Sequence, residues 1–165
     1  GFSLYHPDEL KILLELNFFP DIIQVPYNLL DRKRFEIEYK PIFEKYGMGT
    51  TTWSPLASGA LTGKYLEGIP EGSRASLDGY EWLKKSMVES ERGQERMTKV
   101  AALAPIAEEM EVKLSNLAIA WCLLNENVST VILGASKVEQ LEENLKSTEV
   151  LPLLNQEVIN KLSSI

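Results

Sequence analysis

The run Asp21-Ile22-Ile23-Gln24-Val25-Pro26 decides the fold class of this chain. It is short, rich in β-branched residues and closed by a proline, a pattern typical of a buried strand. Residues 33–46 follow with apolar positions at helical spacing, and Gly47 then supplies a common helix-stop residue. Residues 48–53 form a second strand pattern. A strand, a helix and a strand in this order predict a right-handed βα unit in a parallel sheet.

The same alternation continues toward both ends of the chain. The sequence predicts helices over residues 7–17, 93–110, 115–125, 137–147 and 155–164, and a strand over residues 128–133. The segment before Pro7 has the character of a strand end, which gives four strands in all. We therefore expect an α/β fold with a parallel sheet. It is either half of an eight-stranded βα barrel or most of a small doubly wound sheet, and periodicity does not distinguish the two.

Local signals refine these elements. Pro41 inside the helix of residues 33–46 predicts a kink or a restart, because proline lacks the N–H that a helix interior uses. Asn155 is a suitable N-cap for the last helix. Trp82, Trp121 and Cys122 are expected in the core, the cysteine as a small buried hydrophobe.

The composition excludes several classes of protein. The chain has 165 residues, a net charge of −7, 44% apolar and 25% charged residues, which indicates one globular domain and excludes a disordered or collagen-like chain. A negative net charge is the wrong sign for binding nucleic acid. No apolar run reaches the roughly 18 residues that cross a bilayer, and a single cysteine fits a reducing compartment, so we expect a cytoplasmic protein. The chain lacks an initiator Met and opens at a strand end, so we expect a fragment.

Ligands of parallel α/β sheets bind at the carboxyl ends of the strands, so the candidate site lies there. The segment Trp53-Ser54-Pro55-Leu56-Ala57-Ser58-Gly59 leaves a strand with a flat aromatic ring, a hydroxyl and a flexible glycine. It could stack on a planar ring and offer N–H groups to a phosphate; the alternative is an ordinary loop around a buried tryptophan. Residues 54–90 form a long excursion, and long structured loops are usually functional. Lys64 and Arg74 add two cations to it, but say little alone.

A second candidate lies at Gly134-Ala135-Ser136-Lys137, where a strand turns directly into a helix. Free N–H groups and the helix dipole attract an anion at such a helix N-terminus. The residues that follow on about one helical face are Gln140, Glu143 and Asn144. Their side chains could contact a base attached to that phosphate. The alternative is an ordinary capped surface helix.

Other kinds of catalytic, metal or phosphate site have little support in the sequence. The single histidine, His6, excludes a three-histidine zinc site and stands beside a proline, where a Ser/His/Asp nucleophile has no evident partners. The glycine-rich G-x-G-x-x-G and G-x-x-x-x-G-K-[ST] phosphate motifs are absent from the sequence. We therefore expect neither a metal site nor a nucleophilic triad.

Several motifs occur together and in order along the chain. They are Thr51-Thr52-Trp53-Ser54-Pro55-Leu56-Ala57-Ser58-Gly59, Gly63-Lys64-Tyr65, Ser73-Arg74, Leu117-Ala118-Ile119-Ala120-Trp121-Cys122-Leu123, and Leu133-Gly134-Ala135-Ser136 through Glu143-Asn144. With these motifs the chain resembles the C-terminal half of the aldo-keto reductases. Within that superfamily it is most similar to the β-subunits of voltage-gated potassium channels, whereas residues 1–34 resemble general bacterial-type members.

The resemblance implies the C-terminal half of an eight-stranded βα (TIM) barrel over residues 1–165, with a long cofactor-binding loop at about 54–92. It implies binding of NADP(H) and reduction of aldehydes or ketones by hydride transfer. The residues implied to bind the cofactor are Ser3 and Gln24 at the carboxamide, Trp53 beside the nicotinamide, Ser54, Pro55, Leu56, Ala57 and Ser58 along the pyrophosphate, Lys64 at a phosphate, Arg74 and Ser136 at the 2′-phosphate, with Gly134 in the turn before Ser136, and Gln140, Glu143 and Asn144 around the adenine.

The same resemblance places the family's catalytic Asp, Tyr, Lys and His in the first half of the barrel, and Tyr5, Tyr27 and Tyr65 do not match the catalytic tyrosine. We therefore expect no catalytic residue in this chain, and we expect the missing N-terminal half and a small carbonyl compound as partners. A second hypothesis is a regulatory β-subunit, a homotetramer on the cytoplasmic domain of a potassium channel that uses bound NADP(H) as a redox sensor. A third is a half-barrel that pairs with itself to cover its open strand edges.

Overall fold

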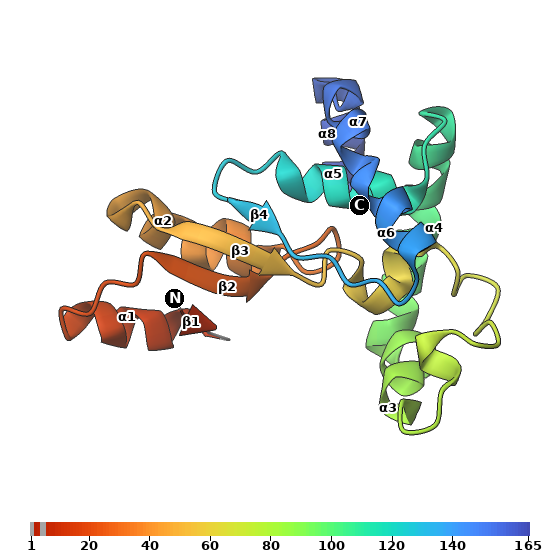
Figure 1. The fold of residues 1–165 in the computed structure, drawn as a ribbon, viewed down its shortest axis with the longest axis horizontal. Coiled ribbons are helices and arrows are strands. Elements are labelled where there is room, and N and C mark those ends of the chain that lie inside the picture. The colour runs from red at the N-terminus through yellow and green to blue at the C-terminus, as the bar shows by residue number, and fades with distance from the viewer. Residues whose placement is uncertain (1, 4–5) are drawn as a thin grey trace.

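A computed structural model describes residues 2–3 and 6–165, so Gly1, Leu4 and Tyr5 lie outside the described residues. Four parallel strands form one sheet in the order β1-β2-β3-β4 (Figure 1). Their bounds are Phe2–Ser3 for β1, Ile22–Pro26 for β2, Gly49–Trp53 for β3 and Thr130–Val131 for β4. Each strand lies beside its predecessor, without the reversal of order that defines a doubly wound sheet. The strand order is that of consecutive strands in a βα barrel.

Helices and short helical turns connect and follow the strands. Their bounds are Pro7–Glu15 for α1, Arg34–Tyr39 for the π-helix η1, Lys40–Tyr46 for α2, Ala57–Thr62 for the 3-10 segment η2, Arg74–Ser76 for the 3-10 turn η3, Glu81–Lys84 for α3, Lys85–Glu89 for the π-helix η4, Glu91–Glu109 for α4, Leu114–Leu123 for α5, Val138–Leu145 for α6, Ser147–Val150 for α7, Leu151–Leu153 for the 3-10 turn η5 and Gln156–Ser163 for α8. The long excursion that begins after β3 is thus a series of short helical turns leading into α4.

The expected helices are present, with two differences near the C-terminal end. The strand predicted over residues 128–133 reduces to the two residues of β4, because Val128 N–H donates to the Asn125 carbonyl in a turn (2.8 Å). The helix predicted over 137–147 ends at Leu145, and the separate helical turn α7 follows it.

The helix signals at Pro41, Gly47 and Asn155 act as predicted. Pro41 lies in the first turn of α2, directly after the π-helix η1, so the predicted restart is confirmed. Gly47 ends α2 with φ +63°, a left-handed conformation that glycine adopts without strain. Asn155 Oδ1 accepts from Val158 N–H at 3.0 Å and so caps α8.

The core lies between the helices and one face of the sheet. Side chains alternate along the central strands, so that Ile23 and Val25 of β2 and Thr50 and Thr52 of β3 are buried on this face. The two buried hydroxyls are satisfied by backbone, since Thr50 Oγ1 donates to the Asn127 carbonyl and Thr52 Oγ1 to the carbonyl at the start of β4. These side-chain bonds help to fix β4 against β3.

Helix α5 is buried on nearly all sides, as its continuous apolar sequence predicts. Cys122 is fully buried and Trp121 is nearly so, which confirms both predictions. The prediction for Trp82 was wrong, because its side chain is 58% exposed. It stands on α3, a single helical turn at the periphery of the molecule (Figure 1), with its ring 6.3 Å from that of Tyr80.

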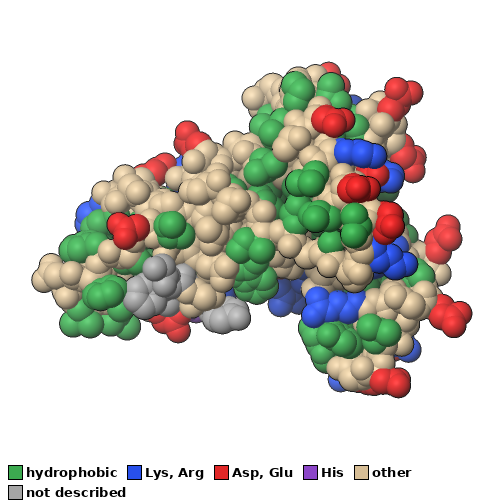
Figure 2. All heavy atoms as spheres, viewed as in Figure 1, with side chains coloured by type: hydrophobic (Ala, Val, Ile, Leu, Met, Phe, Trp, Pro, Cys, Tyr) green, Lys and Arg blue, Asp and Glu red, His purple; other side chains and the backbone are tan. Residues whose placement is uncertain are grey.

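The opposite face of the sheet lacks a helical layer within the described residues. Ser3 and Ile22 are exposed there, and Gln24 and Trp53 are half-buried. Figure 2 shows further hydrophobic side chains at the α1 end of the molecule, where Leu16 is 71% exposed. A closed βα barrel would cover this face with strands from its other half. Within the described part of the chain, no helix combines the length and apolar character needed to cross a membrane.

Candidate functional site

The backbone turns sharply where β3 ends. Ser54, Ala57 and Ser58 have φ values of +58°, +49° and +56°, and Gly59 follows with φ +95°. Left-handed conformations in residues other than glycine cost about 1–3 kcal/mol each and cluster at ligand-binding sites. Residues 54–59, called here the strand-end segment, are therefore held in an unfavourable conformation by the rest of the fold.

The strand-end segment presents alternate residues to solvent. Pro55 and Ala57 are buried, whereas Ser54, Leu56 and Ser58 are half-buried. The N–H groups of Leu56 and Ser58 donate to no protein acceptor in the described part of the chain. The Ala57 N–H between them donates to the Ser54 carbonyl, so the two groups without acceptors alternate with an engaged one. Backbone N–H groups in turns that contain left-handed residues can bind anions. Pro55 and Ala57 can therefore contribute backbone atoms to such a site, but not exposed side chains.

Lys64 lies directly beside the strand-end segment. A Cβ built on Gly59 would stand 3.0 Å from Lys64 Cε and 3.1 Å from Lys64 Nζ, and the left-handed φ of +95° is what favours glycine at this position. The Lys64 ammonium also lies 5.0 Å from the centroid of the buried Tyr65 ring. The structure thus places one exposed cation next to Gly59, at the end of the strand-end segment.

Ser3, Gln24 and Trp53 share the open face of the sheet. Ser3 and Gln24 are directly opposite each other in the β1–β2 register, and Gln24 is opposite Thr51 of β3. Trp53 stands two residues beyond Thr51 and therefore points to the same face. The structure brings these three predicted residues together at the carboxyl end of the sheet, next to the strand-end segment.

The turn after β4 differs from its expected form. Ser136 N–H and Ser136 Oγ both donate to Gln140 Oε1, at 2.9 and 3.1 Å. The Ser136 N–H is therefore engaged by Gln140 rather than free for an anion. Gly134 has open space around the position of a Cβ, so the turn itself is accessible.

Glu143 and Asn144 do not share one exposed face. Glu143 Oε2 lies 2.9 Å from Lys113 Nζ and 3.2 Å from Lys146 Nζ, and these two ammonium groups lower the pKa of the Glu143 carboxyl. Asn144 is 6% exposed and points into the molecule. The exposed part of this predicted set consists of Gln140 and the partly exposed Glu143.

Arg74 lies on the exposed turn η3. Its guanidinium stacks on the Tyr80 ring, 5.0 Å from the centroid, and remains accessible. The preceding Ser73 is buried, and its Oγ has no hydrogen-bond partner among the described residues. Arg74 is held by the Tyr80 ring and Ser136 by Gln140, so their joint role at a phosphate stays a prediction.

Asn28, which follows β2, is the last of the strand-end positions 24–28, but the sequence assigned it no role. Its side chain is 1% exposed, and Nδ2 donates to the Ser54 carbonyl at 3.0 Å. The available signal was an asparagine just after a strand, where Asn commonly closes a turn through its own side chain. Its contact with a residue 26 positions away lies beyond any local pattern.

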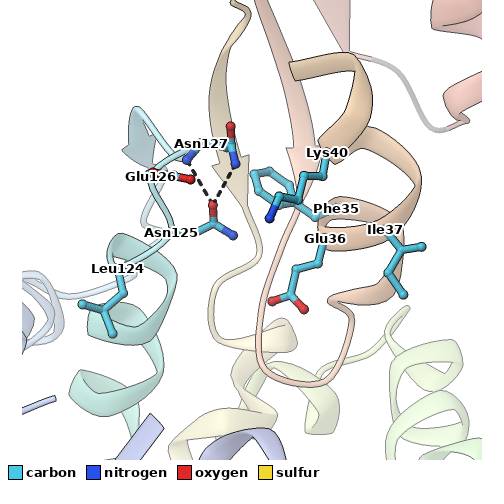
Figure 3. A pocket seen from close by; sticks show the side chains of 8 residues that line it. All are labelled: Phe35, Glu36, Ile37, Lys40, Leu124, Asn125, Glu126 and Asn127. Carbon is cyan, nitrogen blue, oxygen red and sulfur yellow. Dashed lines mark hydrogen bonds between the residues drawn. The ribbon is translucent and has the colours of Figure 1, made fainter. Parts of the chain in front are cut away.

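A cleft of about 560 Å³ opens between η1 and the loop after α5 (Figure 3). Several polar groups in and next to it are paired with protein atoms. Tyr27 Oη donates to Glu36 Oε1 at 2.8 Å and accepts from Asn125 Nδ2 at 3.1 Å, while Asn125 Oδ1 accepts from the Asn127 backbone N–H at 3.0 Å. Burial is the largest cause of a raised pKa at the Tyr27 hydroxyl. Through Tyr27 these hydrogen bonds connect η1 to the loop after α5, and we assign no ligand to the cleft.

The family model of the aldo/keto reductases matches residues 1–165. The chain belongs to the aldo/keto reductase family. A probable voltage-gated potassium channel subunit beta from Oryza sativa subsp. japonica is 48% identical over 147 residues, which cover 88% of this chain and 44% of that protein. This aldo/keto reductase chain therefore spans less than half the length of that curated relative.

Two solved structures share the fold. An aldo-keto reductase from Bacillus halodurans, in its holo form, matches with a TM-score of 0.71 and 26% identity over 99% of this chain and 48% of its own. A glycerol dehydrogenase from Gluconobacter oxydans matches with a TM-score of 0.68 and 22% identity over 99% and 47%, a level of identity that shows the fold alone. The fold is thus α/β with parallel strands and corresponds to about half of an aldo/keto reductase barrel.

Proposed function

We propose that this chain is the NADP(H)-binding half of an aldo/keto reductase that reduces aldehydes or ketones. The observation that carries the proposal is the strand-end segment, where the Leu56 and Ser58 N–H groups have no acceptor among the described residues and Lys64 lies next to Gly59. N–H groups and a cation in this arrangement suit a pyrophosphate. The half-buried Trp53 ring on the adjoining open face suits a planar nicotinamide.

The residues of this chain would bind and orient the cofactor. Gln24 and Ser3 would hold the carboxamide of the nicotinamide, because they are register neighbours on the open face. Trp53 would fix the ring plane from one side. Arg74 would bind the 2′-phosphate through its exposed guanidinium, whose planar fork matches phosphate oxygens. When bound, NADPH supplies the hydride that the carbonyl carbon accepts.

The proton for the carbonyl oxygen would come from outside this chain. Reduction needs an acid placed within hydrogen-bond distance of the oxygen as charge develops on it. Tyr27 is unsuited, because its hydroxyl is buried and already donates to Glu36. The Tyr65 hydroxyl is also buried. We therefore assign the acid and its supporting residues to the other half of the barrel.

Binding of NADPH tests the first part of the proposal. We expect NADPH to quench the fluorescence of Trp53 in a saturable titration, because the ring would contact the nicotinamide. The matched control is the variant Trp82→Phe, which removes an exposed tryptophan of α3 and should leave the quenching intact. The variant Trp53→Phe should abolish most of it. A folded chain with no saturable quenching, and no heat of binding by calorimetry, would contradict the proposal.

Turnover tests the second part. We expect the 165-residue chain alone to reduce a simple aldehyde no faster than background, because we assign the acid to the other half of the barrel. Supplying an N-terminal aldo/keto reductase half with the catalytic tetrad should restore NADPH oxidation, measured by loss of absorbance. Reduction by the chain alone at a rate above the no-enzyme control would refute this division of roles.

A second candidate function follows from the 48% identity to the probable potassium channel subunit of rice. In this alternative the same nucleotide site would serve as a redox sensor in a regulatory subunit, with slow or negligible turnover. Sedimentation of the parent protein with and without a channel cytoplasmic domain distinguishes the two. A tetramer that co-sediments with the domain favours regulation, whereas a monomer with rapid turnover favours an enzyme.

A further inference from the structure

The turn after β2 contacts both peptide groups at the end of β3. Tyr27 N–H donates to the Trp53 carbonyl at 3.2 Å, and Asn28 Nδ2 donates to the Ser54 carbonyl at 3.0 Å. Two consecutive residues of one strand end thus hold two consecutive carbonyls of the next. The second of these carbonyls belongs to Ser54, the first left-handed residue of the strand-end segment.

The orientation of the Asn28 amide is fixed by its own turn. Asn28 Oδ1 accepts from Leu30 N–H and Asp31 N–H, both at 2.9 Å. Because these partners are donors, the oxygen must face them, and the NH₂ group must face the Ser54 carbonyl. The side chain is 1% exposed, so water does not compete for these bonds.

Tyr27, the residue before Asn28, is anchored by its neighbours. The Tyr27 ring contacts the rings of Phe35 and Trp121, with centroids at 4.3 and 4.9 Å, and its hydroxyl donates to Glu36 Oε1. The backbone that carries Asn28 is therefore held in place by the contacts of Tyr27. An amide on a rigid base can impose an orientation on its partner rather than follow it.

The Ser54 carbonyl accepts two hydrogen bonds, from Asn28 Nδ2 and from Ala57 N–H at 2.9 Å. We infer that Asn28 is a positioning residue, which holds the Ser54 peptide in its left-handed turn and thereby keeps the Leu56 and Ser58 N–H groups exposed for the pyrophosphate. The inference rests on the proposed function for its ligand. Its structural part, that Asn28 restrains the strand-end segment, can be measured without any ligand.

The variant Asn28→Asp isolates the donor. It keeps an acceptor for Leu30 and Asp31 but replaces the NH₂ group that bonds to Ser54. Hydrogen exchange of the ligand-free chain should become about tenfold faster at the Ala57 amide, since a typical hydrogen bond stabilises by about one power of ten. Exchange at the β2–β3 ladder should not change. The variant Asn28→Ala, which introduces no charge, should give the same local effect if Asn28→Asp folds poorly.

The control for exchange is Asn116→Asp. Asn116 Nδ2 is another buried donor to a backbone carbonyl, that of Glu143 at 2.7 Å, but lies between α5 and α6. This variant should accelerate exchange near Glu143 and leave Ala57 unchanged. The inference would be overturned if the exchange rate of the Ala57 amide rose no more in the Asn28 variants than in Asn116→Asp.

A binding experiment separates positioning from general loss of structure. The Asn28 variants should weaken NADPH binding about tenfold and leave binding of 2′-AMP unchanged, because 2′-AMP carries no pyrophosphate. Equal loss for both probes would mean that Asn28 supports the fold as a whole and would overturn the positioning role. If the wild-type chain binds neither probe, the proposed function fails, while hydrogen exchange still decides whether Asn28 restrains residues 54–59.

Discussion

Replacing Arg74 by alanine is expected to weaken NADPH binding by roughly 10- to 100-fold, the range of hydrogen bonds to a charged group. Binding of NADH should fall by less than about twofold, because NADH has no 2′-phosphate for the guanidinium to meet. Arg74 is exposed and held by the Tyr80 ring, so its removal leaves no buried partner unsatisfied. Calorimetric titration of both nucleotides, at one salt concentration, gives the two ratios directly.

Two further variants make this test specific. Arg34→Ala removes the same charge from η1, where the side chain is also exposed, and should change the affinity for neither nucleotide. Arg74→Lys keeps the charge but loses the planar fork, so it should recover only part of the NADPH affinity. An equal loss of NADPH and NADH affinity in Arg74→Ala would reject a contact with the 2′-phosphate.

The substitution Gly93→Ala should destabilise the fold, although alanine favours helix by about 1 kcal/mol. A Cβ at Gly93 would stand 2.6 Å from the Met87 carbonyl carbon and 2.8 Å from the Ser86 carbonyl oxygen. Real Cβ atoms do not approach backbone so closely, so η4 must move away from the start of α4. Overpacking of this kind costs about 1–3 kcal/mol, and we expect a net loss of about 2 kcal/mol. Urea denaturation followed by circular dichroism measures it.

The neighbouring Gln94 provides the control for this prediction. Gln94 is exposed in the same turn of α4, so Gln94→Ala shortens its side chain to the same methyl group without a steric conflict. It should leave the free energy of unfolding within about 0.5 kcal/mol of the wild-type value. If Gly93→Ala is as stable as Gln94→Ala, the π-helix η4 is not packed against Gly93 as described.

Much of the architecture was predictable from the sequence because it depends on short-range patterns. The β-branched run of β2 and the continuous apolar run of α5 indicated buried elements, and Gly47, Pro41 and Asn155 marked helix boundaries through their own backbone chemistry. The order of these elements was enough to predict a parallel sheet. The choice between a half-barrel and a doubly wound sheet was not in the periodicity, because both use the same βα units.

The positions of the candidate site residues could be predicted from the sequence, but the directions of their side chains could not. Spacing placed Gln140, Glu143 and Asn144 on one helical face, yet packing against the rest of the fold buries Asn144, and two lysines engage Glu143. The spacing also predicted free N–H groups in the turn before α6, whereas the Gln140 side chain accepts a hydrogen bond from the Ser136 N–H. Side-chain direction depends on neighbours that are remote in sequence, and a periodic pattern contains no information about them.

The types and order of the helices and strands follow from local patterns, because hydrophobic periodicity and capping residues act within a few positions of the chain. Which groups meet at the strand ends depends instead on how the elements pack. Asn28 reaches Ser54 across 26 positions, and Trp82 is exposed because α3 lies at the periphery. The physical reason is that hydrogen bonding and burial depend on three-dimensional proximity, which the βα units create only once they have packed together.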